Sequence, residues 1–183
     1  MNIAQPAQAA RSSEAHLSFL QSIFGEKKER AAWAPLYRAI VARARDPFWY
    51  RQGGVPDTLD GRFDMVAALT ALVLIRLEAL GEAGRGPGVL LTELFVEDMD
   101  SSLRQIGIGD YVVGKHVGRM VSALGGRLAA FRAGDVAAAA RRNLFHDSPP
   151  SEEAVALVAG RLEQFAAALG ALGLGALAEG ALP

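Results

Sequence analysis

The strongest hydrophobic pattern in the chain is an apolar run over residues 65–75 that only Thr70 interrupts. Charged residues stand at its two ends, with Asp64 before it and Arg76 after it, and helix-capping residues precede it. A helix that is apolar nearly all round has to be enclosed by other elements. The pattern therefore predicts a buried central helix over about residues 55–80.

Weaker apolar patterns with helical spacing flank this run, and no stretch keeps the alternation expected of a strand. The sequence therefore predicts an all-α fold, a single-domain helical bundle of about six to seven helices around a buried central helix. We expect a flexible N-terminal tail at residues 1–12, a helical domain at 13–172 and a low-complexity C-terminal tail at 173–183 that frays. The flanking helices are expected at about residues 13–24, 32–45, 88–106, 111–124, 136–145 and 151–169.

Glycine and proline predict where these helices end. Asp46-Pro47 should stop a helix, because the residue before a proline avoids the helical region. Four glycines and a proline predict a loop at residues 81–88, and Gly125-Gly126 predicts a break or a kink. Pro35 is expected in the first turn of its helix, where its missing N–H is not needed.

Composition narrows the class of protein. The chain has 183 residues, no cysteine and a net charge of −1, so thiolate chemistry is excluded and no nucleic-acid partner is expected. The central apolar run is shorter than the ~20 residues of a membrane span, and the N-terminus does not resemble a secretory signal. We expect a cytoplasmic protein, with peripheral attachment at the inner membrane as a further option.

Four polar residues invite a structural interpretation. Asp98 lies at the edge of the apolar stripe of the helix at 88–106, where a carboxylate needs a cationic or hydrogen-bonding partner, and Arg62 is our candidate for it. Asp110 follows a glycine-rich turn and suits a helix N-cap. We interpret Arg62, Asp64, Asp98 and Asp110 first as residues that hold turns against helices, with partner contact as the alternative.

Three consecutive aromatic residues, Phe48, Trp49 and Tyr50, follow the expected stop at Asp46-Pro47. They form either a packed loop that plugs one end of the bundle or an exposed aromatic platform.

Carboxylates gather at the start of the central helix, at Asp57, Asp60 and Asp64, beside Arg62. Such a group can perform acid–base or metal chemistry, but at a helix start it more often satisfies free backbone N–H groups and the helix dipole. No other catalytic constellation is visible. We therefore expect no metal, no cofactor and no enzyme activity, with a small helical enzyme that uses this acidic cluster as an alternative.

Several short groups of residues occur in a characteristic order and spacing. They are Leu36-Tyr37 with Ala44-Arg45 and Tyr50; Val55-Pro56-Asp57-Thr58 with Gly61-Arg62-Phe63-Asp64; Asp98-Met99-Asp100 with Leu103-Arg104; and Gly107 with Gly109-Asp110. In these residues the chain resembles the ubiquinol–cytochrome c chaperone family. The resemblance covers roughly residues 33–146, and its most specific part is the pair of blocks around the start of the central helix.

The resemblance implies an all-helical, non-enzymatic assembly factor for the respiratory cytochrome bc complex. The implied partner is cytochrome b or another subunit of that complex, with a small helical partner protein and transient membrane proximity as further expectations. A chaperone for an apolar membrane segment needs a partly exposed apolar groove. A general helical interaction module is the alternative. We predict that the partner-binding rim consists of Phe48, Trp49, Tyr50, Val55, Pro56, Asp57 and Arg62.

Overall fold

The computed structural model describes residues 28–105, 110–145 and 150–183, and side chains are described in α5 only from residue 114 onward. The tail and the helix expected within residues 1–24 lie outside these ranges. Helices are the only regular elements in the described ranges, which confirms the all-α prediction. A helix at 28–44 is followed by α2 (Pro47–Arg51), α3 (Leu59–Ala79), α4 (Glu82–Gln105), α5 (Asp110–Arg132), α6 (Val136–Leu144), α7 (Glu152–Leu169) and α8 (Leu174–Ala178).

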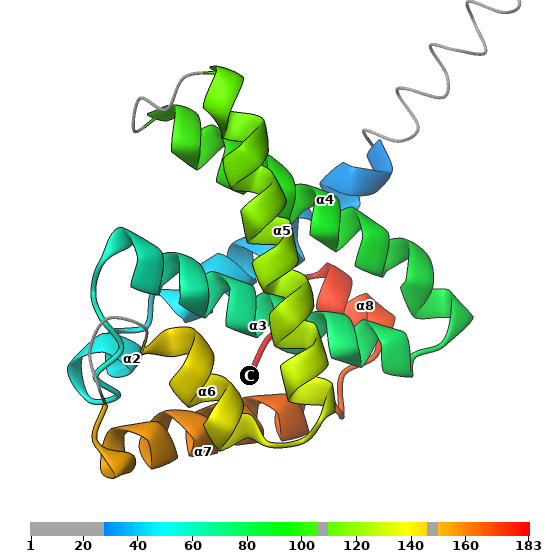
Figure 1. Ribbon diagram of the computed structural model, residues 1–183. Helices are drawn as coiled ribbons and strands as arrows, with labels where there is room; N and C mark the ends of the chain where they lie inside the picture. Colours follow the sequence, from blue (N-terminus) through cyan, green and yellow to red (C-terminus); the bar gives the residue numbers. More distant parts are fainter. Residues whose placement is uncertain (1–27, 106–109, 146–149) are drawn as a thin grey trace, which may run out of the picture.

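Helix α3 is the buried centre of the molecule, as the sequence predicts (Figure 1). It begins after Thr58, whose hydroxyl accepts a hydrogen bond from the backbone N–H of Gly61 at 3.1 Å. Every residue from 64 to 74 is buried, and α4, α5, α6 and α7 all pack against this helix. Each large apolar side chain enclosed in this way contributes about 1.5–3 kcal/mol to folding.

The helix at 28–44 covers the core with Leu36, Tyr37, Ile40 and Ala44, all of them buried. It ends as expected before Pro47, which opens α2. Pro35 lies inside this helix and not in its first turn, because residues 28–34 before it are already helical.

The predicted loop at 81–88 is wrong. Helix α4 already begins at Glu82 and includes Pro87, and only a turn at residues 80–81 separates it from α3. Gly84 explains the difference, because a Cβ at this position would overlap the backbone carbonyl of Leu77. Gly84 is therefore a glycine that lets two helices approach closely. Sequence alone does not distinguish a glycine in a close helix contact from a glycine in a loop.

The predicted break at Gly125-Gly126 is also wrong, since α5 runs without interruption from Asp110 to Arg132. Leu124 and Phe131 are buried on either side of the pair, so packing outweighs the low helix propensity of glycine. Farther toward the start of α5, Val121 is 40% exposed, although its helical spacing from Val117 and Leu124 is that of a core residue. In Figure 1 the end of α4 and the start of α5 extend together beyond the other helices.

The C-terminal part is ordered on the core. Ser151 caps α7 by accepting from the N–H of Ala154 at 3.0 Å, as its sequence predicts. The expected fraying after Gly170 does not occur, because α8 buries Leu177 completely. The alanine, glycine and leucine residues after Gly170 form a low-complexity sequence. In the structure they are small, apolar residues that allow this segment to pack closely on the core.

Candidate functional site

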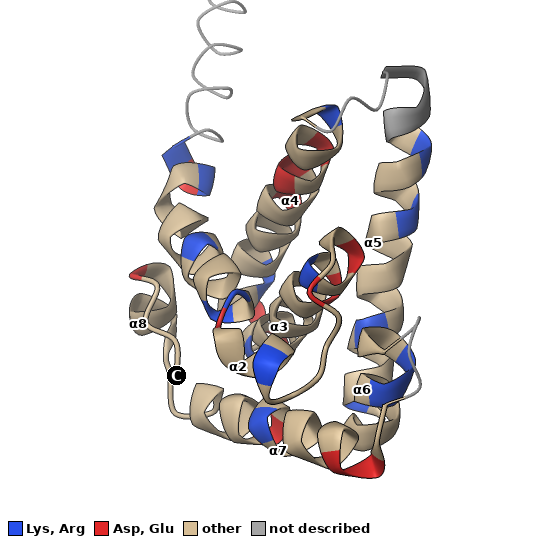
Figure 2. Cartoon of the chain, turned by 90° about the vertical axis from the view of Figure 1, so that its left-hand side faces the viewer, with Lys and Arg blue, Asp and Glu red and all other residues tan. Residues whose placement is uncertain are grey.

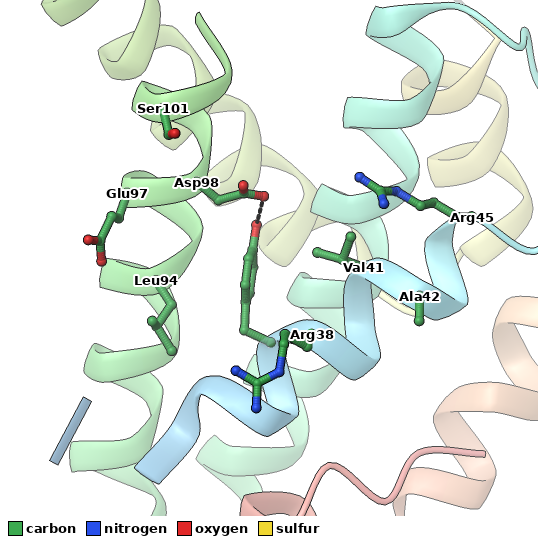
Figure 3. Close-up of a pocket in the computed structure, with 9 residues that line it drawn as sticks. Arg38, Val41, Ala42, Arg45, Leu94, Glu97, Asp98 and Ser101 are labelled. Atoms are coloured by element: carbon green, nitrogen blue, oxygen red, sulfur yellow. Dashed lines mark hydrogen bonds between the residues drawn. The ribbon is translucent and has the colours of Figure 1, made fainter. Parts of the chain in front are cut away.

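A groove of about 510 Å³ opens between the helix at 28–44 and α4 (Figure 3). Its walls combine apolar side chains with charged ones, and both helices contribute to each kind. The lining residues are Tyr37, Arg38, Val41, Ala42, Arg45, Leu94, Glu97, Asp98 and Ser101.

A hydrogen bond from the Tyr37 hydroxyl to the Asp98 carboxylate, 2.8 Å long, joins the two walls. Burial raises the pKa of Tyr37 well above its ordinary value, and the hydrogen bond to Asp98 and the charge of that carboxylate add to the increase. Asp98 therefore has the donor that its place beside the apolar stripe requires. The predicted partner Arg62 is wrong, because Arg62 pairs with Asp57.

The surface continues past Arg45 into a second, smaller groove lined by Arg45, Pro47, Tyr50, Arg51, Asp57 and Arg62. Here Arg62 Nε lies 2.6 Å from Asp57 Oδ1, and this hydrogen bond holds the pKa of Asp57 below its usual range. The Tyr50 hydroxyl donates to the carbonyl of Ala44 at 2.6 Å, and burial raises its pKa to about 12. We call the two grooves together the Arg45 surface.

The three aromatic residues form a short helix, α2, and not a loop. The Asp46 carboxylate caps it by accepting from the N–H of Phe48 at 2.9 Å. Trp49 is 4% exposed and donates its indole N–H to the carbonyl of Arg43 at 2.9 Å. Trp49 is therefore the plug of the first interpretation, whereas Phe48 and Tyr50 are half-buried.

The segment from Val55 to Thr58, which precedes α3, packs against α2 and the start of α3. Val55 is 2% exposed, and its N–H donates to the carbonyl of Trp49 at 3.0 Å. The carbonyl of Pro56 lies where a Cβ on Gly61 would be, so only glycine fits at that position. Trp49 and Val55 thus offer no surface to a partner. For Phe48, Tyr50, Pro56, Asp57 and Arg62 a partner-binding role stays a prediction.

Comparison with known proteins places these features in a family. The sequence model described as "Ubiquinol-cytochrome C chaperone" matches residues 51–182. The chain belongs to the ubiquinol–cytochrome c chaperone family.

A solved structure supports this assignment to the ubiquinol–cytochrome c chaperones. The Cbp3 homolog from Brucella abortus superposes with a TM-score of 0.70 at 30% sequence identity, over 89% of this chain and 94% of that one. A search of curated protein sequences found no match. The family match reaches residue 182, so it extends past residue 146, where the resemblance in the sequence motifs ends.

Asp64, which the sequence analysis interprets as structural, is buried in this chaperone. It accepts from Arg127 in an ion pair in which the side chains are 6% and 3% exposed, respectively. Arg127 also donates to the carbonyls of Ala123 at 3.1 Å and Asn143 at 3.0 Å. Burial lowers the pKa of Arg127, and the Asp64 charge opposes that effect. The pair joins α3, α5 and α6 inside the bundle.

The acidic cluster of the alternative enzyme hypothesis does not converge. Asp57 is exposed and paired with Arg62, Asp60 is exposed in the first turn of α3, and Asp64 is buried against Arg127. In the parts of the chain that the structure describes, no group of three or more His, Cys, Asp or Glu side chains is placed to hold a metal ion. The side chain of Asp110 lies outside the described residues.

The chaperone's described helices include none with the length and apolar character that a membrane span requires. Sequence reasoning gave no site role to Tyr37 or Arg45, although both occur in the residue groups that carry the resemblance, and it did not single out Arg127, which pairs with Asp64 in the core. Arg127 left a signal, because it occupies a helical position between Leu124 and Phe131 where an apolar residue is expected. Arg45 left none, because nothing in the sequence indicates that two grooves meet at it.

Proposed function

We propose that this chaperone of the cytochrome bc complex holds cytochrome b itself, and that the Arg45 surface is where it does so. Membership in the family supports the assembly role. The observation that carries the choice of surface is the open groove at the helix of 28–44, which is partly apolar and has charged residues along its edges.

The groove suits a helical segment of a client protein. Val41, Ala42 and Leu94 supply apolar contact, and an amphipathic helix typically lays its apolar face into a groove of this kind. The Tyr37–Asp98 hydrogen bond fixes the two walls relative to each other, so the groove is available before a client arrives. The described residues contribute no covalent chemistry to this role, which is binding alone.

The test is a substitution that fills the groove without disturbing the core. Ala42 is exposed and lines the groove, so Ala42→Glu introduces a long charged side chain there. Ala32→Glu is the matched control, because Ala32 is exposed on the same helix and outside the groove. In cells that depend on the variant, we expect Ala42→Glu to lower the assembled cytochrome bc complex, its haem spectrum and the cytochrome b that copurifies with the chaperone.

The control variant should leave all three measurements unchanged. Unchanged complex levels in Ala42→Glu would refute the choice of surface. Normal complex levels in cells that lack the whole protein would refute the assembly role.

A further inference from the structure

Three arginines on the Arg45 surface have no partner within the described residues. Arg38, Arg45 and Arg51 are all exposed, and none of their guanidinium groups makes a hydrogen bond or a salt bridge to another described residue. Figure 3 shows Arg38 on the helix at 28–44 and Arg45 just past its end, at two places along the first groove, and Arg51 lines the second groove. The view in Figure 2 shows Lys and Arg along this helix and beside α2.

The carboxylates of the same surface are already engaged. Asp98 accepts from Tyr37, and Asp57 accepts from Arg62. Glu97 pairs with Arg30 at 3.4 Å. The two grooves are lined by four arginines (Arg38, Arg45, Arg51 and Arg62) and three carboxylates (Asp57, Glu97 and Asp98), so this surface has a small excess of positive charge, although the whole chain has a net charge of −1. The charge is local, and it surrounds grooves with apolar walls.

We propose that the Arg45 surface binds an acidic amphipathic segment of a partner polypeptide, which lays apolar residues in the groove and carboxylates on the arginines. Guanidinium groups bind carboxylates through paired hydrogen bonds, which gives this recognition its geometry. Arg38 and Arg45 are about two helical turns apart, roughly 10 Å. The bound segment carries acidic residues at a matching spacing, seven positions apart if it is helical. This inference rests on the proposed function for its location.

The shape and the charge pattern favour a polypeptide over a membrane or a nucleic acid. The arginines border concave grooves, which a flat lipid surface does not enter. Asp57, Glu97 and Asp98 line the same grooves, so a nucleic acid with a charge on every phosphate would meet them, whereas a peptide can place a few carboxylates at the arginines alone. Stacking of bases needs exposed aromatic faces, whereas Tyr37 is buried and Tyr50 is half-buried with its hydroxyl engaged.

The experiment measures binding of a synthetic peptide to the full chain. The peptide is an alanine- and leucine-rich helix with glutamates seven positions apart, and a second peptide carries glutamine at those positions. We expect the glutamate peptide to bind and the glutamine peptide to bind roughly tenfold more weakly or worse. Affinity for the glutamate peptide should fall as salt rises.

Charge reversal tests for direct contact. In the double variant Arg38→Glu, Arg45→Glu the glutamate peptide should lose binding by at least about tenfold, and a lysine version of the peptide should regain it. Arg142→Glu is the matched control, since Arg142 is also exposed and without a partner among the described residues but lies on α6, outside both grooves. A thermal melt confirms that the variants are folded.

Equal binding of the glutamate and glutamine peptides would overturn the proposal, as would equal losses in the double variant and in Arg142→Glu. Arginine-dependent binding to phosphatidylglycerol vesicles or to a single-stranded RNA, without binding to the peptide, would also overturn it. If peptide binding fails while Ala42→Glu still lowers the bc complex, the acidic chemistry is wrong and the proposed function stands. If the peptide binds as described and Ala42→Glu has no effect in cells, the client is wrong and the binding chemistry stands.

Discussion

Tyr37 and Asp98 form the polar contact on which the first groove is built. The tyrosine ring belongs to the core, with 7% of the residue exposed, while its hydroxyl reaches the carboxylate on α4. The contact favours the protonated tyrosine, because an ionised phenolate would be buried next to a negative charge. The folded state therefore holds this proton more tightly than the unfolded chain does.

This difference predicts a specific loss of stability at high pH. Below pH 10, the ordinary pKa of tyrosine, both states keep the proton and the contact contributes fully. As the pH rises above that value the unfolded chain releases the proton and the folded protein does not, so folding becomes less favourable. Between pH 10 and 11 the wild-type protein should lose about 1 kcal/mol more unfolding free energy than Tyr37→Phe. Urea denaturation at both pH values measures it.

The same variant has an expected result at neutral pH. Removing the hydroxyl leaves Asp98 without its donor, which should lower the unfolding free energy at pH 7 by about 1–3 kcal/mol. Stability curves for wild type and Tyr37→Phe that run parallel through pH 11 would show that Tyr37 ionises normally, contrary to the structure.

Single residues mark the limit of what the sequence predicts. It indicates that Asp98 needs a partner, because a carboxylate beside an apolar stripe is costly alone. It does not indicate which partner, since Tyr37 and Arg62 both lie on neighbouring segments and only the packing of the helix at 28–44 on α4 decides. Likewise, the three consecutive aromatic residues predict contact with an apolar surface. They do not predict that Trp49 is buried whereas Tyr50 is only half-buried.

At the scale of elements, a glycine allows the close packing of α3 against α4. Their connection is a two-residue turn, and Gly84 lies against the carbonyl of Leu77 immediately after it. At Gly88, one turn farther along α4, an added Cβ would meet only the side chain of Leu74, at an ordinary contact distance of 3.8 Å. The close approach of the two helices therefore requires glycine at position 84 but not at position 88.

Alanine substitutions at the two positions test this difference. Gly84→Ala should lower the unfolding free energy by roughly 1–3 kcal/mol, because the added methyl group forces α3 and α4 apart. Gly88→Ala is the matched change and should raise it by about 0.5–1 kcal/mol, since alanine loses less backbone entropy in a helix. Both are measured by chemical denaturation. Similar effects of the two substitutions would contradict the close approach at Gly84.

Elements with a strong periodic pattern are the predictable ones. Helix α3 follows from its long apolar run, and α7 from Ser151 and the acids in its first turn. Helix α4 is longer than predicted and α5 is unbroken, because glycine and proline weaken a helix locally while contacts with other helices decide its length. The sequence shows the local effect of glycine and proline, but it does not show the contacts with other helices.

For the molecule as a whole, the C-terminal segment braces a wall of the groove. Helix α8 is anchored by Leu177, which is completely buried. Beyond it the backbone of Gly180 lies against the carbonyl of Pro35, and Arg43 donates to the carbonyl of Leu182 at 3.2 Å. Both contacts are with the helix at 28–44, so residues from the far end of the chain hold the helix that carries Arg38 and Arg45.

Leu177→Ala should therefore loosen the groove as well as lower stability. We expect a loss of about 2–5 kcal/mol in unfolding free energy from the cavity in the core. Hydrogen exchange should rise more in residues 36–44 than in α3, because α3 keeps its contacts with α4, α5, α6 and α7. Leu157→Ala is the control, since Leu157 is 43% exposed on α7 and should change stability by no more than about 0.5 kcal/mol. Uniformly faster exchange across α3 and residues 36–44 would show that Leu177 supports only global stability.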